Sequence, residues 1–225
     1  LLCNIASSQY QSESDIRFKQ EEGVHGRSLT DLFVDVEIDS ETSAASTRLG
    51  RLSGGACQAL LATSHPGILL RGAPGQGKST LLQYACQCYR AAFLNDRANF
   101  PRPTGARAMS NLLRFPIRVD LKDYASWIAR GSTRSRNDRG GQTRHRARPS
   151  LKQFLATYLT ETTGEALSMD TLDDLLDAMP MFVGLDGLDE VADPVLRAVV
   201  ATEIDKFTSQ VVAQRNASLV VVTTR

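Results

Sequence analysis

A glycine-rich segment at residues 72–79 constrains the fold of this chain more than any other feature. It reads GAPGQGKS and matches the pattern GxxxxGK[ST] at every fixed position. The apolar run at residues 68–70 precedes it and indicates a buried β-strand, and residues 79–93 follow it with the apolar spacing of an α-helix. A strand, a tight loop and a helix in this order predict one repeating unit of an α/β domain.

The residue types in this loop are those that hold a chain of phosphates. Glycines let the backbone turn tightly with its N–H groups pointing inward, and the following helix adds the positive end of its dipole. The Lys78 ammonium would reach the β- and γ-phosphates, and the Ser79 hydroxyl would ligate Mg²⁺. The alternative is a glycine-rich strand-to-helix turn with an incidental lysine. The predicted nucleotide-binding residues are Gly72, Ala73, Pro74, Gly75, Gln76, Gly77, Lys78, Ser79 and Thr80.

Short apolar runs alternate with helical stretches through the rest of the chain. The predicted strands are residues 68–70, 115–119, 181–185 and 219–223, and the predicted helices are residues 57–62, 79–93, 120–129, 151–160, 172–179 and 194–212. This alternation predicts parallel strand pairing with helices on both faces of the sheet. Nearly continuous apolar strands agree, because parallel strands are buried on both sides. We therefore expect an α/β fold, the three-layer sandwich of a P-loop NTPase with a mostly parallel central sheet.

The sequence before residue 57 is less regular. Residues 1–30 are polar and predict an N-terminal extension, with a short helix near residues 16–22. In residues 31–39, Leu32, Val34, Val36 and Ile38 alternate with other residues, which predicts a half-buried strand or extended segment. Residues 40–47 are rich in Ser and Thr and predict a linker.

The composition narrows the class of protein. The chain has 225 residues, of which 42% are hydrophobic and 23% are charged, as in a soluble globular domain. It contains no run of about 18 apolar residues, so we expect no membrane span. The net charge of +1 does not favour a nucleic-acid partner. The four cysteines lack zinc-ligand spacing, and we expect reduced thiols in a cytoplasmic protein.

Residues 130–149 interrupt the α/β pattern. They contain seven arginines, one acid and no large apolar residue. Such a segment cannot build a core, so we expect a disordered insert between two elements. Arginine clusters also bind nucleic-acid phosphates, but no aromatic residue here would stack on bases, and a solvated insert is favoured.

A group of acids follows the third predicted strand. Asp186 ends this apolar run as in a Walker B motif, on a strand expected beside the strand of the glycine-rich loop, where it can hold Mg²⁺. Asp189 and Glu190 come next and are placed to orient or deprotonate an attacking water. The alternative is a charge cluster at the N-terminus of the next helix. That alternative fits Asp193, directly before Pro194, better than it fits Asp186.

Polar residues also end the fourth predicted strand, at Thr223, Thr224 and Arg225. The carboxyl ends of strands in an open parallel sheet face the ligand crevice. A polar group there can sense a γ-phosphate, and Arg225 can support its charge. A surface arginine is the alternative.

Three segments together resemble the NACHT branch of the STAND nucleotide-switch ATPases: GAPGQGKST, FVGLDGLDEVAD and VVVTTR. The most specific is the extended Walker B motif, an apolar strand followed by Asp-Gly-x-Asp-Glu, which the chain matches at residues 186–190. Residues 115–125 are similar to the region that follows the P-loop helix in this family. Residues 31–39 are similar to the segment that NACHT proteins place near the adenine pocket. The likeness covers residues 31–225 and is closer to bacterial, NLR-like members than to animal ones.

The resemblance implies an ATP/ADP switch that uses Mg²⁺ and hydrolyses ATP slowly. Asp186 would be the Mg²⁺-associated acid, Asp189 and Glu190 the acids near the hydrolytic water, and Arg225 the sensor arginine. Such proteins exchange ADP for ATP on activation and then self-oligomerise, many of them in immune or antiviral signalling. The implied catalytic residues are Lys78, Asp189, Glu190 and Arg225, and the implied metal-binding residues are Ser79 and Asp186.

The resemblance also implies what lies outside the sequence. The chain stops after the sensor-like strand, so we expect the N-terminal part of a NACHT module. The helical subdomain and winged helix that close over the nucleotide would then be missing, and the trigger and effector stay unknown.

Two other functions use the same scaffold. A turnover ATPase motor of the AAA+ class would carry the same loop and acids, with turnover well above about one per second. A P-loop kinase would carry lid arginines and an acceptor pocket, which the glycine- and serine-rich residues 130–149 do not resemble. ATP is expected rather than GTP, because the chain has no Asn/Thr-Lys-x-Asp element for guanine.

Overall fold

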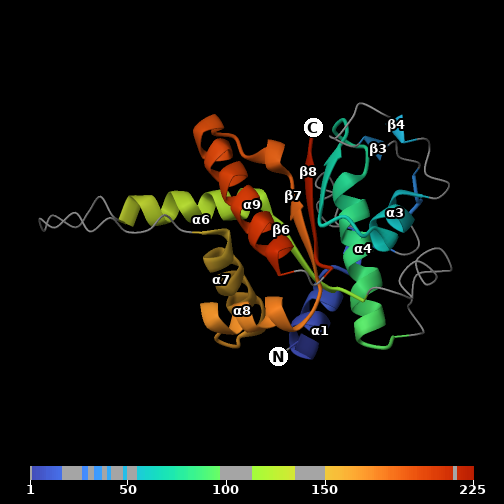
Figure 1. The fold of residues 1–225 in the computed structure, drawn as a ribbon, viewed down its shortest axis with the longest axis horizontal. Coiled ribbons are helices and arrows are strands. Elements are labelled where there is room, and N and C mark those ends of the chain that lie inside the picture. Colours follow the sequence, from blue (N-terminus) through green and yellow to red (C-terminus); the bar gives the residue numbers. More distant parts are fainter. Residues whose placement is uncertain are drawn as a thin grey trace, which may run out of the picture.

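The chain folds as an α/β protein with helices around a central sheet (Figure 1). The structure, a computed structural model, describes residues 2–16, 27–29, 33–36, 40–41, 48–49, 55–96, 113–134, 150–214 and 217–225. The helices are α1 (Leu2–Ser12), α3 (Ala56–Ala62), α4 (Lys78–Phe93), α6 (Leu121–Arg134), α7 (Leu151–Thr163), α8 (Met169–Ala178), η2 (Leu188–Glu190, one 3₁₀ turn) and α9 (Pro194–Ala213). The strands are β1 (Asp15–Ile16), β2 (Arg27–Ser28), β3 (Ser40–Glu41), β4 (Arg48–Leu49), β5 (Gly67–Arg71), β6 (Phe115–Asp120), β7 (Met181–Asp186) and β8 (Leu219–Thr224).

Four parallel strands form the central sheet. Their order is β5-β8-β7-β6, and each neighbouring pair is parallel. The predicted α/β class and the parallel pairing are therefore confirmed. The apolar runs and helical spacings of the sequence also placed these strands and the helices from α3 onward within a few residues of their observed bounds.

The predicted position of the Asp186 strand is wrong. We expected it directly beside the strand of the glycine-rich loop, but β8 lies between β5 and β7. Central strands of a parallel sheet are buried on both faces, and β7 and β8 supply the longest apolar runs for that position. β5 is the edge strand of the described sheet, with Leu69 50% exposed, and not the buried strand that its sequence predicted.

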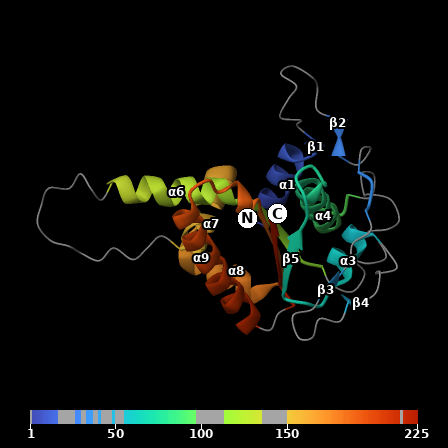
Figure 2. The same ribbon diagram turned by 90° about the horizontal axis from the view of Figure 1, so that it is seen from above.

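Apolar side chains leave the sheet on both faces and form two cores. On one face, α6, α7, α8 and α9 pack over residues such as Ile117, Val183 and Val220. On the other face, α3 and α4 pack over Phe182 and Val221. Successive residues of β7 and β8 alternate between the two cores, as in strands that are covered on both sides. Figure 2 shows α7, α8 and α9 on one side of the sheet and α3 and α4 on the other, which confirms the layered arrangement.

Helix α4 lies close to the centre of β7 because Gly184 has no side chain. A Cβ atom at Gly184 would lie 2.9 Å from Cγ of Leu82, a residue that is 0% exposed. The glycine therefore sets how closely α4, and the loop before it, can approach β7.

The N-terminal residues contain a helix that the sequence did not predict. α1 packs against α4 and α7 and places Ile5 and Ala6 in the core. Its serines and glutamines hid this role: Gln9 is buried although it is polar, and its Oε1 atom accepts a hydrogen bond from Arg90. The helix expected near residues 16–22 is not formed at Ile16, which pairs with β2; residues 17–22 lie outside the described residues.

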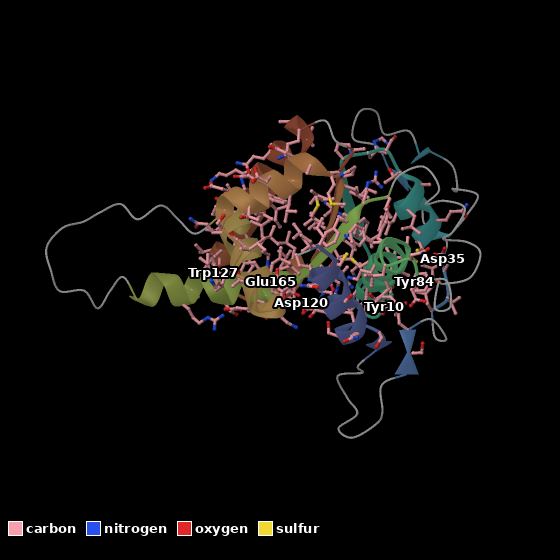
Figure 3. All side chains as sticks on the ribbon, turned by 90° about the horizontal axis from the view of Figure 1, so that it is seen from below. Tyr10, Asp35, Tyr84, Asp120, Trp127 and Glu165 are labelled. Carbon is pink, nitrogen blue, oxygen red and sulfur yellow. The ribbon has the colours of Figure 1, made fainter. Side chains whose placement is uncertain are left out.

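Residues 33–36 are extended, but in the opposite phase to the prediction. Val34 is 78% exposed and Val36 is 47% exposed, whereas Phe33 and Asp35 are partly buried. The Phe33 ring stacks on Tyr84 with centroids 3.6 Å apart, and Asp35 accepts a hydrogen bond from the backbone N of Cys57 at 2.8 Å. These two contacts turn the valines outward, and Figure 3 shows Asp35 and Tyr84 together on this side of the molecule.

Two segments expected to lack structure are partly ordered. β3 pairs with β4, so residues 40–41 at the start of the expected linker form a short ladder, while residues 42–47 lie outside the described residues. α6 continues to Arg134, five residues into the expected insert, although Gly131, Ser132 and Thr133 have low helix propensity. The disorder expected for the insert stays a prediction, because residues 135–149 also lie outside the described residues.

The cysteines differ in their exposure to solvent. All four cysteines are free; Cys3 is exposed, and Cys57, Cys86 and Cys88 are buried. Burial raises the pKa of the Cys86 thiol to about 12, so this thiol stays protonated. None of the helices that the structure describes is long and apolar enough to cross a membrane.

Candidate functional site

The loop between β5 and α4 depends on glycine at two positions. Gly75 and Gly77 have φ angles of +78° and +76°, a backbone conformation that residues with side chains rarely adopt. Gly77 directly precedes α4 and contributes no side-chain cap to the helix. The first N–H groups of a helix that lacks such a cap are the donors that bind phosphate and other anions.

Two side chains of the loop fold back on it. Nζ of Lys78 donates to the carbonyl oxygens of Gly72 and Ala73, at 2.6 and 3.0 Å. The Oε1 atom of Gln76 accepts a hydrogen bond from the backbone N of Ala73 at 2.7 Å. A Cβ atom at Gly72 would lie 2.5 Å from that Oε1 atom, so a larger residue there would displace the Gln76 side chain from Ala73. Thr80 is half-buried, and the exposed residues of the loop are Ala73, Pro74, Gly75, Gln76, Gly77 and Ser79.

The Asp186 carboxylate connects the loop to the ends of two strands. Its Oδ1 atom accepts hydrogen bonds from Oγ of Ser79 at 3.0 Å and from Oγ1 of Thr223 at 2.6 Å. Asp186 is only 6% exposed. The structure therefore brings Ser79 and Asp186 together, as their predicted metal role requires, even though a strand separates β5 from β7.

The chain turns sharply after Asp186. Gly187 has a φ of +76°, and a Cβ atom there would lie 3.2 Å from Cγ of Glu190. The backbone N of Gly187 donates to Oγ1 of Thr223 at 2.7 Å. Thr223, which we expected only as a polar strand end, thus fixes both Asp186 and the turn that leads into η2.

The predicted catalytic acids have different surroundings. Asp189 pairs with the predicted sensor arginine: its Oδ2 atom lies 2.7 Å from Nε of Arg225, whose side chain is 66% exposed. Glu190 is exposed at the end of η2. Asp193 accepts hydrogen bonds from the first backbone N–H groups of α9, so its prediction as the N-cap before Pro194 is confirmed.

An arginine that the sequence patterns did not single out also contacts Asp186. Nη2 of Arg118, in β6, donates to Oδ2 of Asp186 at 2.9 Å and to Oδ1 of Asp120 at 3.1 Å. Burial alone would lower the pKa of Arg118, but the negative charges of Glu13, Asp120 and Asp186 raise it above its ordinary value. The guanidinium therefore stays charged. An arginine inside the apolar run FPIRVD was the available signal, because a buried charge requires an opposite charge.

The oxygen atoms of Ser79 and Asp186 suit a hard cation. Mg²⁺ prefers oxygen ligands, keeps several waters, and is often held by one or two protein oxygens together with substrate phosphates. Within the described residues, no three His, Cys, Asp or Glu side chains lie together in a way that could hold a metal ion. A magnesium ion at Ser79 and Asp186 would therefore take waters and bound phosphates as its other ligands.

Comparisons with known proteins do not identify this site. A scan against protein-family models finds no match, and a search of curated proteins finds no matching relative. The function has to be inferred from the residues themselves and from their geometry.

Proposed function

We propose that this chain is the nucleotide-binding module of a NACHT/STAND-type signalling protein, with a P-loop NTPase fold that binds ATP and ADP with Mg²⁺. The observation that carries the proposal is the meeting of Ser79 and Thr223 at Oδ1 of Asp186. One carboxylate thereby links the glycine-rich loop, the acid-bearing strand β7 and the neighbouring strand β8. A glycine-rich turn with an incidental lysine would have no need of this arrangement.

Each residue of the loop has a role toward the phosphates. The amides at the start of α4 would donate to phosphate oxygens, and Lys78 would exchange its two carbonyl partners for the β- and γ-phosphates. Oδ1 of Asp186 accepts a hydrogen bond from the Ser79 hydroxyl, which leaves lone pairs of the serine oxygen for the metal. When bound, Mg²⁺ would neutralise charge between the β- and γ-phosphates.

The acids of η2 support slow hydrolysis of ATP. Asp189, which pairs with Arg225, and Glu190 are the acids that we place near the attacking water. Arg225 is mostly exposed and would support the charge of the γ-phosphate. Nucleotide-dependent switching, self-association on activation and a role in defence signalling are proposed from the resemblance of the DGLDE motif alone.

Binding of fluorescent ADP and ATP to the purified chain, in Mg²⁺ and in EDTA, tests the nucleotide site. We expect Lys78→Ala to weaken binding on the order of 100-fold, because it removes charge-assisted hydrogen bonds worth about 3 kcal/mol together. Lys206→Ala, which removes an exposed lysine on α9, is the matched control and should bind as the unchanged chain does. Equal binding by the Lys78→Ala variant would remove the basis of the proposal.

Turnover separates the switch from the other P-loop functions. Steady release of phosphate above about one per second, in the ordinary enzyme range, would favour a motor ATPase over a switch. ADP together with a phosphorylated acceptor and no free phosphate would indicate a kinase. Competition between ATP and GTP for the same site would decide the base.

A further inference from the structure

Arg118 holds the oxygen of Asp186 that the two hydroxyl groups leave available. Ser79 and Thr223 both donate to Oδ1, whereas Arg118 donates to Oδ2 at 2.9 Å. A carboxylate held at both oxygens cannot rotate about its Cβ–Cγ bond. Arg118 therefore fixes the direction in which Oδ1 faces Ser79.

The position of Arg118 follows from the strand register. Arg118 lies beside Gly184 and Asp120 beside Asp186 in the parallel pair of β6 and β7. Residues two apart share a face of a strand, so these four residues lie on one face of the sheet. It is the face covered by α4, because a Cβ atom at Gly184 would meet Leu82 of that helix.

An acid at the end of the N-terminal helix holds Arg118 from the other side. Oε1 of Glu13, the residue directly after α1, lies 3.8 Å from Nη1 of Arg118. Its Oε2 atom lies 2.8 Å from Nη1 of Arg90, which is 0% exposed in α4. Glu13 thus connects a strand residue that contacts Asp186 with the helix that begins at the glycine-rich loop.

Further hydrogen bonds fasten this end of α1 to α4. Gln83 donates to the carbonyl oxygen of Glu13 at 2.8 Å, and Gln87 donates to that of Tyr10 at 2.9 Å. Arg90 donates to Oε1 of Gln9 at 2.9 Å. The orientation of Glu13 is therefore set by how α1 docks on α4.

From these contacts we propose that Arg118 is a positioning residue for Asp186, and that Glu13 couples the docking of α1 to Mg²⁺ binding through Arg118. This proposal rests on the proposed function, which assigns Asp186 to Mg²⁺. Among the described residues, loss of the Glu13 contact leaves Asp120 and Asp186 as the ion-pair partners of Arg118, and the carboxylate then holds Ser79 less firmly.

The test measures nucleotide affinity in Mg²⁺ and in EDTA for each variant. The ratio of the two affinities is the Mg²⁺-dependent gain. Arg118→Gln should bind nucleotide in EDTA as the unchanged chain does, and should lose about tenfold of its Mg²⁺-dependent gain, as when an outer partner of a metal ligand is removed. Arg118→Lys keeps the charge and should restore most of the gain. Glu13→Gln should lose less, about threefold, and adding it to Arg118→Gln should cause no further loss, because the two residues act through one contact.

Lys122→Gln is the matched control. Lys122 lies 3.6 Å from Asp120, the same acid that Arg118 contacts, but its only ion pair in the described residues is with that acid. Lys122→Gln removes one positive charge from the same cluster, as Arg118→Gln does, but it removes no contact with Asp186. We expect no change in the Mg²⁺-dependent gain.

Two results would overturn the positioning role. An Arg118→Gln variant with an unchanged gain would show that Arg118 is not needed, and one with a larger gain would show that Arg118 only competes with the cation. Should Arg118→Gln fail to fold by circular dichroism, Glu13→Gln decides, and an unchanged gain in that variant overturns the proposal. The proposed function fails separately, if the unchanged chain binds no nucleotide in either condition.

Discussion

Two arginines four positions apart on the chain, at opposite ends of β6, have opposite surroundings. Arg114, directly before the strand, is 0% exposed and donates to neutral oxygens: the carbonyls of Ala217 and Thr63, each at 2.7 Å, and the Tyr89 hydroxyl at 3.1 Å. Arg118, near the strand's carboxyl end, is surrounded by acids. An arginine at one end of the sheet thus donates hydrogen bonds to neutral oxygens of the fold, whereas an arginine near the other end forms ion pairs with acids.

This difference separates the part of the sheet that maintains the fold from the part that can bind a ligand. At the amino end, Arg114 ties together loops that lie far apart in the sequence. Burial raises the pKa of the neighbouring Tyr89 although Arg114 acts in the opposite direction, so the phenol stays neutral there. At the carboxyl end the acids meet hydroxyl groups and an exposed loop, which is where an open parallel sheet binds ligands.

The largest effect on stability should come from the amino end. Arg114→Ala leaves the carbonyl oxygens of Ala217 and Thr63 without their donor and should lower the free energy of unfolding by about 3 kcal/mol. Urea unfolding followed by circular dichroism measures this loss, with the m-value as the check on two-state behaviour. The Mg²⁺-dependent gain in nucleotide affinity should not change. A selective loss of the Mg²⁺-dependent gain in the Arg114→Ala variant would contradict this division of the sheet, because Arg114 would then contribute to ligand binding as well.

A smaller loss is expected at the middle of the sheet. Gly184→Ala pushes a Cβ atom against the buried Leu82 side chain and should cost about 2 kcal/mol of stability through overpacking. Gly67→Ala in β5 is the matched control, since its Cβ atom would have an ordinary contact 3.5 Å from Thr208. Thermal unfolding of the two variants should therefore differ. Equal stability would mean that α4 can move away from β7 without cost.

At the carboxyl end, stability and binding should change together. Thr223→Val removes the hydroxyl that donates to Asp186 and accepts from the Gly187 N–H, and should cost about 1.5 kcal/mol of unfolding free energy. It should also reduce the Mg²⁺-dependent gain, unlike Arg114→Ala. Thr224→Val, the same change one residue later, is the control. Equal effects of the two valine variants on nucleotide binding would contradict the role assigned to Thr223.

The smallest effect on stability should come from the exposed ion pair. Arg225→Gln breaks the contact with Asp189, but Arg225 is 66% exposed, and such a pair contributes less than about 0.5 kcal/mol. Urea unfolding should be nearly unchanged while phosphate release falls. A loss of unfolding free energy above about 1 kcal/mol would show that Arg225 stabilises the fold, contrary to the role assigned to it in the site.

Local sequence patterns predicted most of the elements and part of the site. Apolar runs and helical spacing are local properties, so β7, β8, α4 and α9 could be located from the amino-acid sequence alone. The pairing of Ser79 with Asp186 was also accessible, because both residues belong to patterns with a known chemical role.

Long-range choices could not be predicted in the same way. The position of β8 between β5 and β7 depends on which strands bury both faces, and no single segment encodes that comparison. The contacts of Arg118 with Glu13 and Asp186 join three distant segments. The helix α1 was missed because its burial depends partly on Arg90, a residue of another helix.

The place of β8 in the sheet also determines when the site can form during synthesis. Among the described strands, β5 pairs only with β8, which comes after all the others in the chain. A nascent chain that has emerged only as far as β7 contains the glycine-rich loop and Asp186. It does not yet contain β8, the strand that pairs with both β5 and β7. Closing such a long loop is slow and leaves unpaired strand edges exposed in the meantime. Residues 219–224 must therefore leave the ribosome before β5 can join the sheet, and until then only the packing of α4 on β6 and β7 can hold the loop near the carboxylate.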